Sequence, residues 1–98
     1  MKKTKKPYVV VRTYSAGVFA GYLESRKGKD GTLTNARRIW YWSGAASLSQ
    51  LAMEGVKSPG QCKFAMPVNR VDLTEIIEVL YVTPAAQTNI SEVPIWKQ

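Results

Sequence analysis

Three strand-forming segments follow one another near the N-terminus, and the short turns between them restrict the fold more than any other feature of the sequence. The first segment contains a run of three valines at 9–11, which favours a strand. Ser-Ala-Gly at 15–17 supplies a turn, and a returning strand is expected over about 18–26. A polar turn at 27–32 leads to a third strand over about 32–43. Strands with such short connections are expected to be antiparallel neighbours.

Side-chain alternation assigns the residues of these strands to faces. In the second strand, Phe19 and Leu23 are expected on one face, and Val18, Ala20 and Tyr22 on the other. Gly21 stands in mid-strand, which predicts a bulge or a close approach by another backbone segment.

The third strand has basic and apolar residues on both of its faces. Alternation places Arg38, Trp40 and Trp42 on one face and Arg37, Ile39 and Tyr41 on the other. A strand with water on one side rarely has this pattern. We therefore expect either that the same chain covers both faces or that one face meets a partner subunit or a ligand.

The rest of the chain predicts shorter elements. A helix is expected over roughly 45–54, capped by Ser43 or Ser47 and ended by Gly55. A short strand at 62–68 and a longer strand at 71–83 follow, the second with a bulge or bend near 75–77. Thr83 and Pro84 then predict the start of a helix over 84–92, and residues 93–98 close the chain as an edge strand or an extended arm with Trp96 packing back.

These elements define the expected fold class. It is a small α+β domain with an antiparallel sheet of about five strands and two short helices. Residues 7–98 form this single domain, and residues 1–6, with their four lysines, form a flexible basic tail.

Several kinds of chemistry are excluded or disfavoured by composition. The chain contains no histidine and one cysteine, Cys62, so it lacks the commonest general base and a zinc ligand set. Cys62 without a base is expected to be a small buried hydrophobe. No metal or other cofactor is predicted, and an enzyme is the least favoured class. No apolar run is long enough to span a membrane, and we expect no signal peptide.

The positive charge is unevenly distributed. The net charge is +7, with thirteen basic and three acidic residues before position 71 and one basic and four acidic residues after it. The lysines at the N-terminus act either as a solubilising tail or as an arm for nucleic acid. The basic body suits a phosphate-bearing partner.

Residues 37–42, Arg-Arg-Ile-Trp-Tyr-Trp, form the one block that suggests a binding site. Arginine offers a fork of donors to phosphate oxygens, and tryptophan or tyrosine offers a flat face on which a base can stack. A competing interpretation places Trp40 and Trp42 in the core and leaves Arg37 and Arg38 as plain surface charges.

A wider set of segments resembles a known family. The segments are VVVRTYSAGVFAGYLE, NARRIWYWSGAASLSQLAMEGVK, CKF, LTEIIEVL and VPIWK. Together they resemble small phage-encoded proteins, and in particular the first Thoeris anti-defence family. Members of that family are sponges that bind cyclic ADP-ribose isomers, or in some cases cyclic oligonucleotides, and release them intact. The resemblance implies a dimer, with possible assembly into hexamers, in the cytoplasm of the infected bacterial host.

The expected function is therefore sequestration of a cyclic nucleotide immune signal at a subunit interface, without cleavage. None of the family's ligand residues is carried over to this chain, so the candidate site rests on residue type. It comprises Arg12, Tyr14, Arg37, Arg38, Trp40, Tyr41, Trp42, Asn69 and Arg70, the last two on an expected loop. Two other functions stay open: a small basic nucleic-acid-binding phage protein, and a phage structural protein without a ligand.

Overall fold

The computed structural model describes residues 6–96, and within them the expected α+β fold is confirmed. The described chain contains six strands, two α-helices and one turn of 3-10 helix. Their bounds are β1 Tyr8–Thr13, β2 Val18–Lys27, β3 Asp30–Tyr41, α1 Leu48–Glu54, η1 Pro59–Gln61, β4 Lys63–Phe64, β5 Val68–Leu73, β6 Ile76–Tyr81 and α2 Pro84–Ser91.

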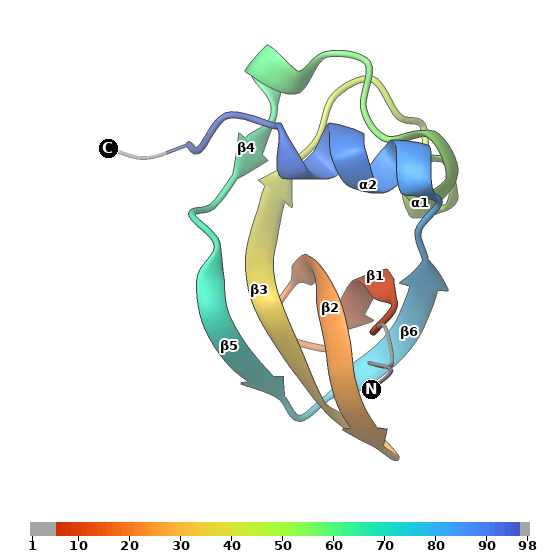
Figure 1. Ribbon diagram of the computed structural model, residues 1–98, viewed down its shortest axis with the longest axis vertical. Coiled ribbons are helices and arrows are strands. Elements are labelled where there is room, and N and C mark those ends of the chain that lie inside the picture. The colour runs from red at the N-terminus through yellow and green to blue at the C-terminus, as the bar shows by residue number, and fades with distance from the viewer. Residues whose placement is uncertain (1–5, 97–98) are drawn as a thin grey trace, which may run out of the picture.

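The sheet is antiparallel, and both of its edges are built from late segments of the chain. β3, β2, β1 and β6 are neighbours in that order, and β4 and β5 pair with opposite ends of β3. β5 and β6 therefore lie on opposite sides of the molecule, and they converge at the end where the β2–β3 hairpin turns (Figure 1).

The expected single strand over 71–83 is wrong. It is divided into β5 and β6, with only Thr74 and Glu75 between them. Leu73 pairs with Gly31 of β3, whereas Ile76 pairs with Thr13 of β1. The two halves thus satisfy their backbone groups on different strands, which is why the alternation of the sequence slips at this point.

The sheet curls around an inner core. All five longer strands contribute to one buried cluster of Val9, Val11, Phe19, Leu33, Ala36, Leu73 and Ile76. We call the side of the sheet that carries this cluster the inner face. Phe19 and Leu23 lie on it, as expected, and Gly21 opposes β3 so closely that an added Cβ would lie 3.0 Å from the Ala36 Cα atom.

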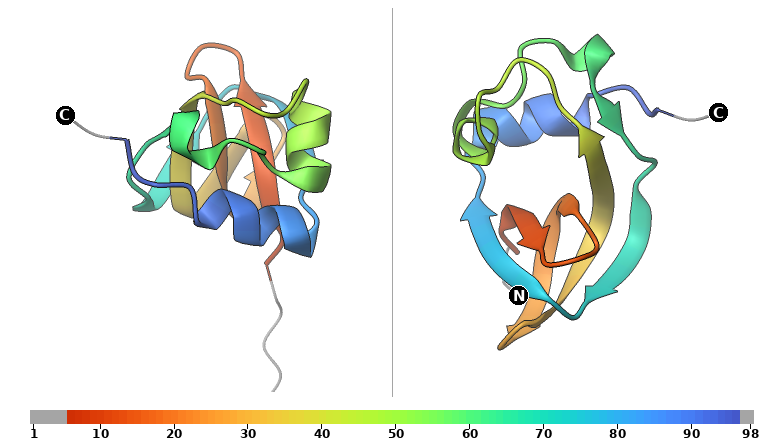
Figure 2. Two further views of the ribbon diagram at one scale, coloured as in Figure 1. Left: turned by 90° about the horizontal axis from the view of Figure 1, so that it is seen from above. Right: turned by 180° about the vertical axis from the view of Figure 1, so that it is seen from behind.

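The two helices cover the other side of the sheet, which we call the helical face. They lie together at one end of the curled sheet (Figure 2). Leu51 of α1 and Ile90 of α2 pack there against a cluster that includes Val10, Ala20 and Phe64. The same chain thus covers most of both faces of β3, but Trp40 and Tyr41 at its end stay exposed.

The helix ends follow the local sequence. α1 begins at Leu48, three residues later than expected, because Ser47 is the cap and its side chain accepts a hydrogen bond from the Gln50 amide. Gly55 ends α1 with a positive φ of 79°. Thr83 caps α2 by accepting from the Ala86 amide, as its sequence predicts.

The chain closes with an extended arm beside β4. Ile95 forms a parallel bridge with Phe64, and the Trp96 amide donates to the Phe64 carbonyl over 2.9 Å. The expected arm is confirmed for residues 93–96. Residues 97–98, and residues 1–5 of the expected basic tail, lie outside the described chain.

Candidate anion-binding site

Arg37 is buried on the helical face, with only 3% of its surface exposed. Its guanidinium donates hydrogen bonds to four backbone carbonyls, those of Phe64, Ala65, Ile90 and Val93, over 2.8–3.4 Å. Ile90 is in the last turn of α2 and Val93 follows the helix end, where helix carbonyls lack partners within the helix. Burial lowers the pKa of Arg37, and the nearby Tyr8 partly opposes this effect. Arg37 is therefore a structural residue, and its assignment to a ligand site is wrong.

Arg38 lies on the inner face and has a different environment. The register pairs it with Phe19 of β2, and its guanidinium carbon lies 4.8 Å from the centre of the Phe19 ring and 5.3 Å from that of Trp40. Both distances are within the range of cation–π contacts. In residues 6–96, Arg38 is the residue with a buried side-chain nitrogen, Nε, that has no hydrogen-bond partner. Stacking on two rings, and not hydrogen bonding, holds this cation.

A hollow of about 180 Å³ opens beside Arg38. It exists because Ala36 pairs with Val68 of β5 while the Ala65 amide donates to the Arg38 carbonyl, so the chain at 66–67 departs from β3. The lining consists of Phe19, Ala36, Arg38, Ala65, Met66, Val68 and Val71. Arg38 is the only charged residue in this lining. An anion in the hollow would therefore meet a cation without a competing carboxylate.

Trp40 extends the site toward solvent. It is 58% exposed, so the interpretation that placed it in the core is wrong. Met66 and Val68, which line the hollow, are also about half exposed. A flat apolar group in the hollow would meet these aliphatic side chains, and the exposed Trp40 indole lies next to Arg38.

The structure separates the other predicted site residues from Arg38. Arg12 forms an ion pair with Glu78 over 2.9 Å, and Arg70 forms one with Asp72 over 3.3 Å. Asn69 and Arg70 are on strand β5, and not on a loop as expected.

The remaining aromatic candidates also lie elsewhere. Tyr14 is exposed in the β1–β2 turn, beside another hollow that includes Lys29 and Glu75. Trp42 follows the end of β3, so the alternation no longer applies to it, and it packs against the helical core instead of joining Trp40. Tyr41 is about half exposed and pairs with Lys63 of β4. Of the nine predicted residues, Arg38 and Trp40 are the two that meet.

Sequence reasoning missed the six other residues that line the hollow, which are Phe19, Ala36, Ala65, Met66, Val68 and Val71. The hairpin register could have indicated Phe19, because it places this ring opposite Arg38. Met66 and Val68 carry no such signal. They reach the hollow only because β5 returns to the same edge of β3 that β4 occupies.

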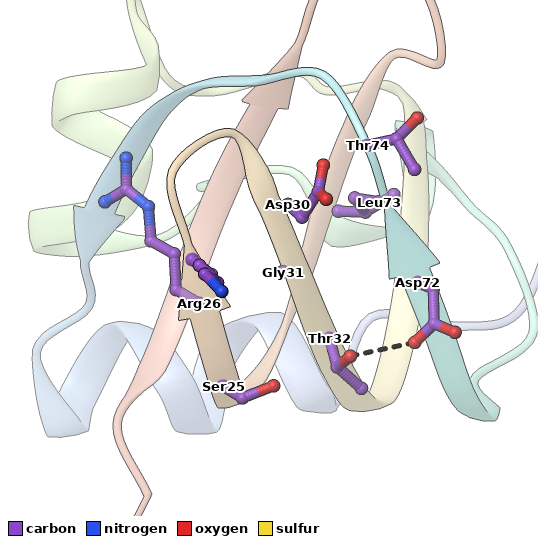
Figure 3. Close-up of a pocket in the computed structure, with 9 residues that line it drawn as sticks. Ser25, Arg26, Asp30, Gly31, Thr32, Asp72, Leu73 and Thr74 are labelled. Carbon is purple, nitrogen blue, oxygen red and sulfur yellow. Dashed lines mark hydrogen bonds between the residues drawn. The ribbon is translucent and has the colours of Figure 1, made fainter.

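A third hollow, of about 250 Å³, lies at the β2–β3 hairpin and β5 (Figure 3). Its lining includes Arg26 and Lys27 but also Asp30 and Asp72. Thr32 donates a hydrogen bond to Asp72 over 2.8 Å, and this bond, followed by one from Arg70, lowers the pKa of the Asp72 carboxyl. Ionised carboxylates disfavour a phosphate in this hollow, so the Arg38 hollow is the better anion site.

Residues 6–96 contain neither a group of acidic, cysteine and histidine side chains that could hold a metal ion nor a helix long and apolar enough to cross a membrane.

Fold and site together define a small α+β domain with a candidate anion-binding hollow at the rim of its inner face. The chain belongs to the family described as Domain of unknown function (DUF6948), whose model matches residues 6–90. None of the curated proteins and none of the solved structures matches it.

Proposed function

We propose that this protein is a phage anti-defence sponge that binds cyclic nucleotide immune signals and holds them intact in the cytoplasm of the infected host. The signals are cyclic ADP-ribose isomers or cyclic oligonucleotides. The observation that carries the proposal is Arg38, a stacked cation without a hydrogen-bond partner among residues 6–96, beside a hollow with no carboxylate in its lining.

The chemistry of the hollow suits a nucleotide. The forked donors of Arg38 match phosphate oxygens, and the exposed ring of Trp40 gives a base a surface to stack on. Base stacking on an aromatic side chain contributes roughly 1–3 kcal/mol. A ligand that combines a phosphate with a flat ring would use both groups at once.

Holding the ligand, and not cleaving it, also suits this lining. Apart from Arg38, the lining side chains are aliphatic, aromatic or thioether groups. They include no carboxylate, hydroxyl, thiol or imidazole that could act as a general base or nucleophile. These properties support sequestration.

The size of the hollow supports a site shared between copies of the chain. Its volume of about 180 Å³ is below the ~300–1,000 Å³ of typical small-molecule pockets. A single copy can thus enclose a phosphate or part of a base, and a second copy would enclose the rest. We propose a homodimer, with further assembly into a hexamer.

Native mass spectrometry of the full chain tests this function. The protein is mixed with cyclic ADP-ribose isomers and a panel of cyclic oligonucleotides, and the retained ligand is analysed after heat denaturation. The expected result is an unchanged ligand on a dimer or hexamer. Arg38→Gln should abolish retention, whereas Arg12→Gln, which removes the same charge from an exposed ion pair, should preserve it.

Three other results contradict the proposal. No retention across the panel would exclude these ligands, and a chemically altered ligand would indicate an enzyme. Binding of single-stranded nucleic acid that weakens steeply with salt would favour the nucleic-acid-binding alternative, because polymer binding releases counterions.

A further inference from the structure

β5 is an edge strand of the sheet, and one of its sides has no partner strand. Within residues 6–96, β5 pairs with β3 on one side, and no described strand pairs with the other. It lies at the margin of the molecule (Figure 1). The free backbone groups of such an edge can pair with a strand of another chain unless side chains prevent it. The side chains of β5 therefore decide what this edge can accept.

Arg70 and Asp72 give β5 one cation and one anion on the same side. They are two residues apart, so they share a side of the strand, and their side chains form an ion pair over 3.3 Å. Thr32 of β3 donates to the Asp72 carboxylate from that side. Both charged side chains are largely exposed, at 67% and 63%. The edge thus carries charges that cancel, and not the like charges that repel a second strand.

This charge pattern is self-complementary when two copies of β5 meet in antiparallel orientation. With a two-fold axis at Val71, Arg70 lies opposite the partner's Asp72, and Asp72 lies opposite the partner's Arg70. Opposite charges at directly paired positions stabilise antiparallel strands, and like charges there destabilise them. A two-fold axis at Arg70 or at Asp72 would bring two like charges together. Charge therefore selects the register centred on Val71.

The edge strand on the other side of the sheet, β6, has no such pattern. Glu78 is the only charged residue of β6, and it is already paired with Arg12 of β1. Ile77 and Tyr81, the exposed residues of β6, are not charged and select no register by charge. β5 is therefore the edge whose side chains specify a partner.

We infer that this protein forms its homodimer by antiparallel pairing of β5 with β5 of a second copy, in the register centred on Val71. The inference rests on the homodimer of the proposed function and specifies its interface. Val68 and Val71 line the Arg38 hollow, so a strand added to β5 extends the wall of the hollow. In this register the partner's Thr74 lies opposite Val68. The second copy thereby enlarges a hollow that is too small for a whole nucleotide in one copy.

Sedimentation equilibrium of the full chain over a range of concentrations tests the interface. The wild-type protein should dimerise reversibly, because a single pair of strands gives a small interface. Arg70→Asp and Asp72→Arg each bring like charges together, and each should raise the dissociation constant of the dimer about tenfold. The double variant Arg70→Asp/Asp72→Arg exchanges the two charges, restores opposite charges across the interface and should restore the dimer.

A mixture of the two single variants gives the sharpest result. One variant carries two carboxylates on β5 and the other carries two guanidinium groups, so the two should form a heterodimer where neither forms a homodimer. A folding defect cannot produce this outcome. Arg12→Asp is the matched control, because Arg12 belongs to an exposed ion pair elsewhere in the sheet and its replacement changes the net charge as Arg70→Asp does. This control should keep the dimer.

Several results would overturn the inference. They are a monomer at all concentrations, a dimer that Arg70→Asp leaves intact, and single variants that dissociate but do not combine when mixed. A dimer that Tyr81→Lys dissociates and Arg70→Asp does not would place the interface on β6.

The same variants separate this inference from the proposed function. If cyclic ADP-ribose is retained by a dimer that survives Arg70→Asp, the sponge function stands and the β5 interface is wrong. If the dimer depends on the charges of β5 but no cyclic nucleotide is retained, the interface stands and the sponge function is wrong.

Discussion

Arg37 and Arg38 are adjacent in β3, yet their guanidinium groups lie on opposite sides of the sheet. Within residues 6–96, the Arg37 group donates hydrogen bonds and the Arg38 group does not. Arg37 donates to four carbonyls beneath α2, whereas Arg38 lies over the Phe19 and Trp40 rings. The first arginine joins the C-terminal end of α2 to the sheet. The second has a buried Nε without a hydrogen-bond partner within residues 6–96 and lies beside the hollow. Replacing each one should therefore affect a different property of the protein.

Arg37→Met should destabilise the fold strongly. The Phe64 and Ile90 carbonyls also accept from backbone amides, so the substitution leaves the Ala65 and Val93 carbonyls without their donor. Each such group costs about 1–3 kcal/mol, so we expect the free energy of unfolding to fall by at least about 2 kcal/mol. Urea denaturation measures this change. Arg38→Met, at the neighbouring position, should change the free energy of unfolding by less than about 1 kcal/mol. Similar losses in the two variants would contradict the division of roles.

Ligand binding should change the fluorescence of Trp40. This indole is exposed and contacts Arg38 beside the hollow. Trp96 is also exposed but lies on the C-terminal arm, and Trp42 is partly buried against the helical core. Stacking of a base on Trp40 is expected to quench its emission in the cyclic nucleotide titration. Trp40→Phe should remove the quenching and weaken binding by a few fold, and Trp42→Phe should keep it. Quenching that survives Trp40→Phe would place the ligand elsewhere.

Asn89→Asp should destabilise the contact between α2 and the loop after α1. The Asn89 side chain accepts from the Val56 amide over 2.8 Å and donates to the Val56 carbonyl over 2.9 Å. Aspartate keeps the acceptor but loses the donor, so the Val56 carbonyl loses its partner. We expect a loss of about 1–3 kcal/mol in thermal or urea unfolding. A Tm equal to that of the wild type would show that this pair contributes nothing to stability.

Stability should fall at high pH because of Tyr8. Burial, the largest effect, raises the pKa of this phenol from 10.0 to about 12 in the folded state, with Arg37 opposing the change. The unfolded chain then loses the proton first, so the stabilising contribution is complete below pH 10 and is lost between about pH 10 and 12. The full shift corresponds to about 3 kcal/mol.

The comparison with Tyr8→Phe isolates this effect from the titration of the lysines. Both proteins are unfolded with urea at a series of pH values, and the wild-type free energy should decline relative to that of the variant above pH 10. Parallel curves would show that Tyr8 has an ordinary pKa.

Much of the fold follows from local sequence. The β1–β2 hairpin, the Gly21 irregularity, the Ser47 and Thr83 caps and the Gly55 helix end all depend on residues close to one another in the chain. Such features are predictable because turn conformations and capping bonds are made within a few residues. The division of 71–83 into β5 and β6 was not predictable, because it depends on pairing with β3 and β1, about 40 and 65 residues away.

The candidate site shows the same limit. Sequence alone determined that an arginine-rich aromatic strand exists and that Arg37 and Arg38 face opposite sides of it, since alternation is a property of any strand. The position of α2 decides which arginine is structural. The Ile90 and Val93 carbonyls that accept from Arg37 lie more than 50 residues further along the chain. Packing of distant segments fixes which charge is buried and which remains accessible, because a buried arginine must find acceptors that only the assembled fold supplies.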